Sequence, residues 1–306
     1  MQALLRAILS PSFAASILRV TTPILFAALG AVVADLSGVV NIALEGTMLF
    51  SAFTGVAVSA FTQSAWLGLL AAVGVGALVG LTLAYSHLKL GTDAVLAGIA
   101  LNLLAAEGTV FLLYVVAGDK GVSSSLPSKV LPDWHIPVIK EIPVLGAILG
   151  KQNALTYMSL IAVVLVYLFL FKTSFGLRLR AVGENPDAAD SVGISVHRVQ
   201  FVALAISGAL AGMGGAHLSM GYVSWFSRNM TSGRGFIALA AETLGYRHPV
   251  GVFLASLLFG FADALSNYMQ SLRVPGEFVQ MIPYLLTLVA LTIYSGRQRK
   301  GRRSSK

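Results

Sequence analysis

The sequence predicts an all-α fold, a polytopic bundle of about 8–10 transmembrane helices, because apolar stretches long enough to cross a hydrocarbon layer recur along it. Of the 306 residues, 56% are hydrophobic and only 11% are charged. Soluble domains usually contain about 25% charged residues, so an ordinary water-soluble core is excluded. Membrane β-barrels show alternating segments of about 10 residues, and the sequence contains none.

Nine segments fit such helices. They cover residues 13–34, 40–61, 66–87, 94–117, 153–171, 196–218, 233–245, 251–268 and 278–294. The seventh is too short for a full crossing, which predicts a tilted or broken helix. Glycines at close spacing predict tight helix contacts in lipid. These are Gly74, Gly76, Gly80, Gly208, Gly212 and Gly215.

The basic residues predict the orientation of the bundle. The formal net charge is +8, and six of the 21 lysines and arginines lie in the last ten positions. Because basic residues gather in cytoplasmic segments of membrane proteins, the C-terminus is expected in the cytoplasm of a multi-pass plasma (inner) membrane protein, and no nucleic-acid partner is expected. Alternation then places 175–196 in the cytoplasm and both 118–152 and the N-terminus outside. We expect one transmembrane domain, 1–306, in contact with membrane lipid.

Catalytic and cofactor motifs are missing from the sequence. It has no G-x-x-x-x-G-K-[ST] nucleotide loop, no H-E-x-x-H and no G-x-S-x-G. Its five histidines are scattered, and its lack of cysteine excludes disulfides, iron–sulfur clusters and thiolate zinc sites. We therefore expect no catalytic residue, metal site or cofactor in this chain.

Polar residues inside the apolar segments are candidates for lining a solute path, because charges at membrane depth usually face a bundle interior or water. Asn41 and Glu45 stand four apart, which predicts one shared helix face, and Asp263 and Asn267 have the same spacing. The alternative is that such groups hydrogen-bond between helices or pair with basic groups. The full set is Asn41, Glu45, Asn102, Glu107, Glu242, Asp263 and Asn267.

The polar segment 175–196 contains a helix-start signal. Asn185 is suited to cap a helix, Pro186 to its first position, and Asp187 to its first turn, where the helix dipole favours an acid. Gly193 fits the helix end. A short capped helix made slim by Ala188 and Ala189 favours docking to a partner protein over a simple interfacial loop.

Three stretches carry a family resemblance. Residues 183–196 (GENPDAADSVGISV) closely resemble the cytoplasmic coupling segment of permease subunits from ATP-binding-cassette importers of simple sugars, nucleosides and branched-chain amino acids. Residues 35–49 (DLSGVVNIALEGTML) resemble the early motif of these permeases. Residues 233–251 (GRGFIALAAETLGYRHPVG) resemble their later glycine-rich motif, with a departure at 246–249. N-I-x-x-E-G is most similar to the nucleoside-type permeases, since amino-acid permeases usually have N-F-x-x-G.

The resemblance implies an importer permease fold and a transport subunit that is not itself an enzyme. It implies that cytoplasmic ATPase subunits use the ATP, that a second permease subunit completes the pore, and that an extracytoplasmic binding protein delivers the solute. The ATPases would dock on the coupling residues, Gly183, Glu184, Asn185, Pro186, Asp187, Ala188, Ala189 and Gly193. The predicted solute is a small hydroxylated molecule, a nucleoside first and a ribose- or galactose-like sugar second. An ion-coupled secondary transporter remains the alternative from another class, because it too would use buried carboxylates.

Overall fold

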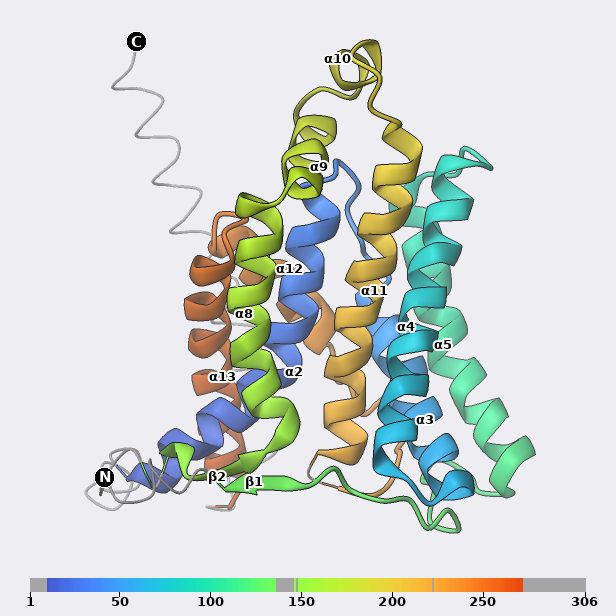
Figure 1. Ribbon diagram of the computed structural model, residues 1–306. Helices are drawn as coiled ribbons and strands as arrows, with labels where there is room; N and C mark the ends of the chain where they lie inside the picture. Colours follow the sequence, from blue (N-terminus) through green and yellow to red (C-terminus); the bar gives the residue numbers. More distant parts are fainter. Residues whose placement is uncertain (1–9, 136–145, 147, 222, 272–306) are drawn as a thin grey trace.

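The computed structural model describes residues 10–135, 146, 148–221 and 223–271, which form a bundle of long helices (Figure 1). Seven of the described helices are long and apolar enough to cross a membrane. They are α2 (Pro11–Asp35), α3 (Leu44–Thr62), α4 (Ala65–Leu88), α5 (Ala94–Ala117), α8 (Ala154–Lys172), α11 (Val196–Met220) and α13 (Pro249–Ser271). The predicted all-α membrane bundle is confirmed. The predicted last span, 278–294, and the basic tail lie outside the described residues.

The remaining elements are short. They are α9 (Ser174–Glu184), α10 (Pro186–Ser191), α12 (Arg234–Leu244), β1 (Asp133–His135) and β2 (Lys151–Asn153). The strands pair antiparallel, with Trp134 opposite Gln152. This strand pair, here called the hairpin, lies in the segment 118–152 except for Asn153 at its edge. The short seventh segment is α12, a helix of 11 residues.

Side-chain oxygens fix where several helices begin. The first N–H groups of a helix lack partners within it, and a preceding Ser, Asp or Asn can accept from them. Ser10 accepts from Phe13 at the start of α2, and Ser64 does the same for α4. Asp93 accepts from two N–H groups of α5, and Asn153 caps α8. These polar residues therefore set the boundaries of otherwise apolar helices.

Helix α2 forms the centre of the bundle (Figure 1). Its residues from Thr21 to Ala34 are all buried. It contacts α8, α11, α12 and α13 along its length. The helices around it carry the exposed apolar side chains, and α5 is the least buried of the seven.

Glycines bring α4 and α11 into backbone contact. A Cβ atom added to Gly76 would overlap the carbonyl of Gly208 and come within 2.9 Å of the Cα of Gly212. A Cβ on Gly80 would overlap the carbonyl of Leu204. Gly74 is different, because a Cβ there would meet nothing within 4 Å. The predicted close packing is therefore confirmed for Gly76, Gly80, Gly208, Gly212 and Gly215 but is wrong for Gly74.

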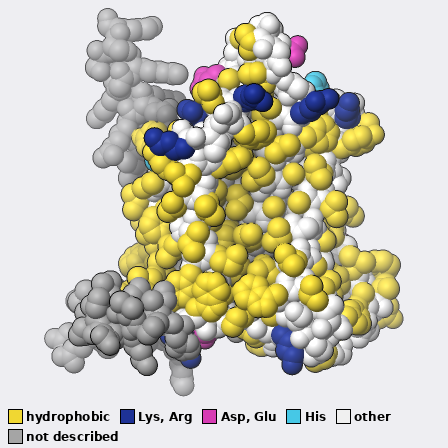
Figure 2. All heavy atoms as spheres, in the orientation of Figure 1, with side chains coloured by type: hydrophobic (Ala, Val, Ile, Leu, Met, Phe, Trp, Pro, Cys, Tyr) yellow, Lys and Arg dark blue, Asp and Glu magenta, His cyan; other side chains and the backbone are white. Residues whose placement is uncertain are grey.

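The bundle has two different ends. Helices α9 and α10 form a projection, here called the handle, beside the α4–α5 and α12–α13 turns at the top of Figure 1. The hairpin and the start of α2 lie at the opposite, loop end. Basic side chains gather near the handle above a broad hydrophobic band (Figure 2). On this side are Lys89, Lys172, Arg178, Arg180, Arg198 and Arg247.

Candidate functional site

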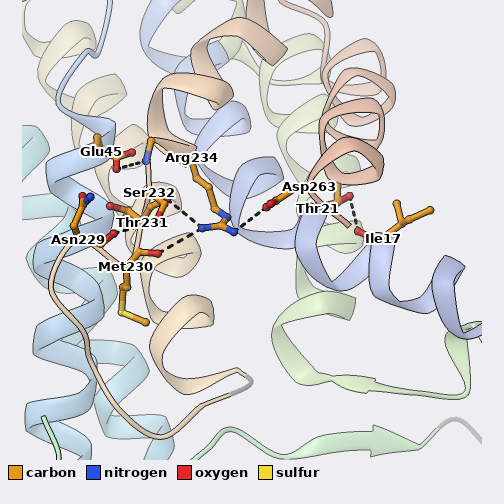
Figure 3. A network of polar contacts seen from close by, with 10 residues as sticks. Ile17, Thr21, Glu45, Asn229, Met230, Thr231, Ser232, Arg234 and Asp263 are labelled. Atoms are coloured by element: carbon orange, nitrogen blue, oxygen red, sulfur yellow. Dashed lines mark hydrogen bonds and ion pairs between the residues drawn. The ribbon is translucent and has the colours of Figure 1, made fainter. Parts of the chain in front are cut away.

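Two helices begin inside the bundle, and one carboxylate joins them. Glu45, in the first turn of α3, accepts the backbone N–H of Gly233 at 2.8 Å and that of Gly235 at 2.7 Å (Figure 3). These N–H groups lie at the start of α12, where the helix dipole is equivalent to about half a positive charge. A Cβ on Gly235 would approach the backbone N of Glu45 to 2.5 Å, so glycine is required there. Glu45 thus caps α12 from another helix.

Arg234 and Asp263 form an ion pair beside this cap. The guanidinium donates to the Asp263 carboxylate at 2.8 Å, joining α12 to α13 (Figure 3). It also donates to the carbonyls of Met230 and Thr231 at 3.5 and 3.3 Å. The two side chains are only 18% and 14% exposed. Such a desolvated pair is held by its additional hydrogen bonds as well as by charge.

Glu107 of α5 pairs with Arg228, in the segment before α12, at 3.0 Å. Unlike the previous pair, both side chains are largely exposed, at 73% and 60%. Asp263 lies fourteen residues into α13 and Glu107 thirteen into α5, each about 20 Å from the handle end at 1.5 Å per residue. We call Glu45, Glu107, Arg234 and Asp263 the mid-membrane layer, together with the side chain of Arg228, which reaches Glu107 from a backbone bonded to Gly121 beyond the loop end of α5.

Two asparagines form hydrogen bonds that hold the start of α3 and the segment before it. Asn41 donates to the Ser207 hydroxyl of α11 at 2.9 Å and accepts from the N–H of Ala43. Asn102 of α5 accepts from the N–H of Gly46 at 2.7 Å and donates to the carbonyl of Ile42 at 2.9 Å. Both therefore hydrogen-bond between segments, as the alternative interpretation described. The predicted shared helix face of Asn41 and Glu45 is wrong, because α3 begins only at Leu44.

Glu242 lies apart from this layer, at the handle end of α12. Its side chain is buried, and its Oε1 lies 3.9 Å from Nε of Arg247. The same nitrogen lies 2.5 Å from the Asp35 carboxylate at the end of α2. These three side chains line a cavity of about 490 Å³ together with Val40, Ile42, Leu239, Thr243 and Tyr246.

Asn267 is exposed on α13, one turn beyond Asp263. It lines a second cavity, of about 340 Å³, with Trp225 and Arg234. The structure thus divides the seven predicted path residues into the mid-membrane layer, the entry to α3, the handle-end cavity and this second cavity.

The cations of the layer were not among the predicted site residues. Arg234 stands within the glycine-rich motif 233–251, and Arg228 shortly before it. A cation next to a short apolar segment signals that an acid must lie nearby in the fold, and this signal could have identified both. Asp35 and Arg247 are joined only by the tertiary fold, since more than 200 residues separate them.

The handle has the predicted capped helix. Asn185 accepts the N–H of Ala188 at 3.0 Å, Pro186 begins α10, and Gly193 follows it with a φ of +83°. Ala189 is buried against the chain, whereas Ala188 is exposed. Of the two alanines expected to make the helix slim for docking, Ala188 is therefore accessible to a partner and Ala189 is not. The exposed residues of this region include Glu184, Pro186, Asp187, Ala188 and Val192, the last at 74%.

The handle is packed against the segment that leads to α3. A Cβ on Gly183 would overlap the carbonyl of Leu36, and one on Gly38 would lie 3.4 Å from the Cα of Gly183. Gln200 of α11 donates to the Ser37 carbonyl at 3.2 Å. The segment 36–46 therefore touches the handle at one end and, through Glu45 and Asn102, reaches α12 and α5 at the other.

Comparisons with known proteins agree with this architecture. The family described as branched-chain amino acid transport system / permease component matches residues 13–291. The guanosine ABC transporter permease protein NupQ of Bacillus subtilis is 39% identical over 90% of this chain and 89% of its own length. The nucleoside ABC transporter permease protein NupC of Lactococcus lactis is 35% identical over 92% of each chain.

Two further likenesses concern substrate and fold. A putative glucose ABC transporter permease protein, TsgC13 of Haloferax volcanii, is 35% identical over 86% of this chain and 80% of its own. An inward-facing structure of a putative metal-chelate type ABC transporter superposes with a TM-score of 0.55. It covers 91% of this chain and 84% of that one at 16% identity, which supports the fold alone.

Proposed function

The chain belongs to the family of branched-chain amino acid transport system permease components, and we propose that it is the membrane-spanning subunit of an ATP-driven importer of nucleosides. In this proposal the subunit forms half of the translocation path. ATP is hydrolysed by separate cytoplasmic subunits, and this chain supplies neither a nucleotide site nor a cofactor.

The charge balance of the mid-membrane layer favours an uncharged solute. The Glu45 carboxylate lies on the positive end of α12, Asp263 pairs with Arg234, and Glu107 pairs with Arg228. A zwitterionic amino acid at membrane depth would need unpaired charges of both signs, because isolated charges there are costly. A nucleoside or a sugar needs only hydrogen bonds.

The relatives' names support a nucleoside first. Two relatives named for guanosine or nucleosides are 39% and 35% identical to this chain, and a relative named for glucose keeps a sugar as the alternative. A substrate screen separates the two. The assembled transporter, reconstituted with its binding protein, should take up nucleosides in an ATP-dependent manner and leave sugars and branched-chain amino acids outside.

The handle is the proposed docking site for the ATPases. Asn185 fixes the start of α10, and the exposed side chains of Pro186, Ala188 and Val192 offer an apolar contact, with Asp187 and Glu184 at its edge. The basic residues around the handle favour a cytoplasmic location for this end and hence for the C-terminus. Movement of α10 would tilt α8 and α11 and switch the path between its two openings.

The other partners follow from the same assignment. A second permease subunit would complete the path, and an extracytoplasmic binding protein would dock at the loop end, including 118–152. Both are expected in a plasma-membrane complex.

Co-purification from the native host tests the assignment. A tagged chain, solubilised gently, should bring down an ATPase that is lost when residues 185–189 are replaced by a Gly/Ser segment of equal length. A chain that purifies alone and drives uptake in liposomes from an ion gradient would establish the secondary-transporter alternative instead.

A further inference from the structure

The ion pair between Glu107 and Arg228 is placed where a lipid-facing ion pair would be costly. Glu107 lies thirteen residues after Ala94 and ten before Ala117, or about 20 and 15 Å from the two ends of α5. That is near the middle of a hydrocarbon layer about 30 Å thick. Its side chain is 73% exposed and that of Arg228 60% exposed.

An exposed charge at this depth does not face lipid, because ionisable groups inside membranes turn to the bundle interior or to a water-filled cavity. The contrast with the neighbouring pair is informative. Arg234 and Asp263, at similar depth, are almost covered by the chain itself. Of these two pairs, the Glu107–Arg228 pair is the one that presents its polar groups outward, so its face must meet water or another molecule.

Most of the hydrogen-bonding capacity of this pair is unused within the described part of the chain. Their side chains are joined there by a single bond, from one guanidinium nitrogen to one carboxylate oxygen. A guanidinium carries five N–H donors and a carboxylate accepts through both oxygens, so donors and acceptors remain for an outside partner.

We infer that Glu107 and Arg228 are solute contacts in the translocation path, and that they bind a nucleobase through an edge on which N–H donors lie next to a carbonyl oxygen. This inference rests on the proposed nucleoside importer and specifies its contact point. A carboxylate accepts from base N–H groups, while a guanidinium donates to keto oxygen and ring nitrogen. Guanosine and inosine present such an edge. Adenosine, with an amino group in place of the keto oxygen, fits it less well.

Cysteine labelling tests the location, and the chain is well suited to it because it contains no cysteine. In the purified complete transporter, Glu107→Cys should react with a membrane-impermeant cationic methanethiosulfonate reagent, and guanosine should slow the reaction. Leu78→Cys on α4 is the matched control, since Leu78 is 60% exposed and lies thirteen residues after Ala65 and ten before Leu88. It should stay unlabelled in lipid.

A second variant tests the same location without breaking the ion pair, in case Glu107→Cys misfolds. Ser232→Cys is nearly isosteric, exposed and close in sequence to Arg228, and it leaves the ion pair intact. It should be labelled and protected in the same way. If neither position reacts in the outward- or inward-facing state, the pair is covered by a neighbouring subunit and the inference is overturned. Labelling that no nucleoside slows also overturns it.

Transport kinetics test the chemistry. Glu107→Gln should raise the KM for guanosine and inosine about tenfold and change the KM for adenosine by less than twofold. Equal changes for all three nucleosides would reject the edge contact. If the wild-type transporter moves nucleosides while these tests fail, only this inference is lost. If it moves none, the proposed function fails independently.

Discussion

The Arg247 guanidinium lies 2.5 Å from the Asp35 carboxylate, which ties the turn after α12 to the end of α2. This turn is the place where the sequence departs from the usual family pattern. Tyr246 and Arg247 both have positive φ, 56° and 57°, which is uncommon for residues other than glycine. The ion pair helps to hold this unusual turn, and the buried Glu242 lies beside it.

Arg247→Gln should therefore lower the stability of the chain. It leaves the acidic side chains of Asp35 and Glu242 close together without their cation, and because Arg247 is 60% exposed we expect a loss of about 1–2 kcal/mol. The melting temperature in detergent measures it. Adding Glu242→Gln should restore part of the loss, and an unchanged melting temperature in Arg247→Gln would show that the turn needs no cation.

Gly76→Ala should separate α4 from α11. The new methyl group would overlap the Gly208 carbonyl, and such overpacking typically costs about 1–3 kcal/mol. Gly74→Ala on the same helix is the matched control, because its methyl group would meet nothing within 4 Å. Yield of folded protein and melting temperature should fall only for Gly76→Ala. Equal behaviour of the two variants would contradict the backbone contact.

Ala188→Trp should abolish ATP-driven uptake without unfolding the chain. Ala188 is exposed on α10, so the indole would obstruct the proposed ATPase docking surface. Ala189→Trp should instead reduce the amount of folded protein, because Ala189 is only 4% exposed. Co-purification of the ATPase and melting temperature distinguish the two effects. Normal uptake in Ala188→Trp would remove α10 from the coupling surface.

Glu45→Ala should destabilise α12 and reduce uptake together. It leaves the N–H groups of Gly233 and Gly235 without their acceptor, a loss of about 2 kcal/mol if it resembles other helix caps. Glu45→Gln keeps one acceptor oxygen and should lie between wild type and Glu45→Ala. Hydrogen exchange of residues 235–238 reports the loosening. Impaired uptake with unchanged exchange would assign Glu45 a direct role in the path.

The loop end should lose local order at low pH. Hydrogen bonds from the backbone N–H and hydroxyl of Ser125 lower the pKa of Asp119 below its ordinary value of 3.8. A lowered pKa stabilises the folded loop above the unfolded pKa, and this contribution is lost as the pH falls through the folded pKa. Ser125→Ala should raise the pH at which proteolysis of 119–126 begins. If the pH at which proteolysis begins is unchanged, the hydrogen bonds between Asp119 and Ser125 do not stabilise the loop.

The sequence predicts those features of the fold that are local. The apolar lengths indicate the long helices, and Asn185-Pro186-Asp187 indicates the start of α10, because capping depends on neighbours along the chain. The late start of α3 was missed. It depends on hydrogen bonds with Asn102 of α5 and Ser207 of α11. No local sequence pattern predicts these contacts. Gly74 and Gly76 likewise differ only in which face of α4 meets α11.

The candidate site shows the same division. Glu45 and Asp263 could be identified as polar groups at membrane depth, but their partners are set by the tertiary fold. A carboxylate that caps a helix and one that contacts a solute are identical in sequence. Their surroundings distinguish them, since Glu45 is bonded to backbone N–H groups, whereas Glu107, which we propose as the solute contact, is largely exposed beside Arg228.

The contact between Gly183 and the turn after α2 has a mechanical consequence. There is no side chain between them: a Cβ on Gly183 would already lie 2.9 Å from the carbonyl carbon of Leu36 and 3.1 Å from the nitrogen of Gly38. A displacement of the handle therefore cannot be accommodated there by a change of side-chain rotamer. The displacement would pass directly from main chain to main chain into the segment 36–46, and so reach the middle of the membrane without being reduced.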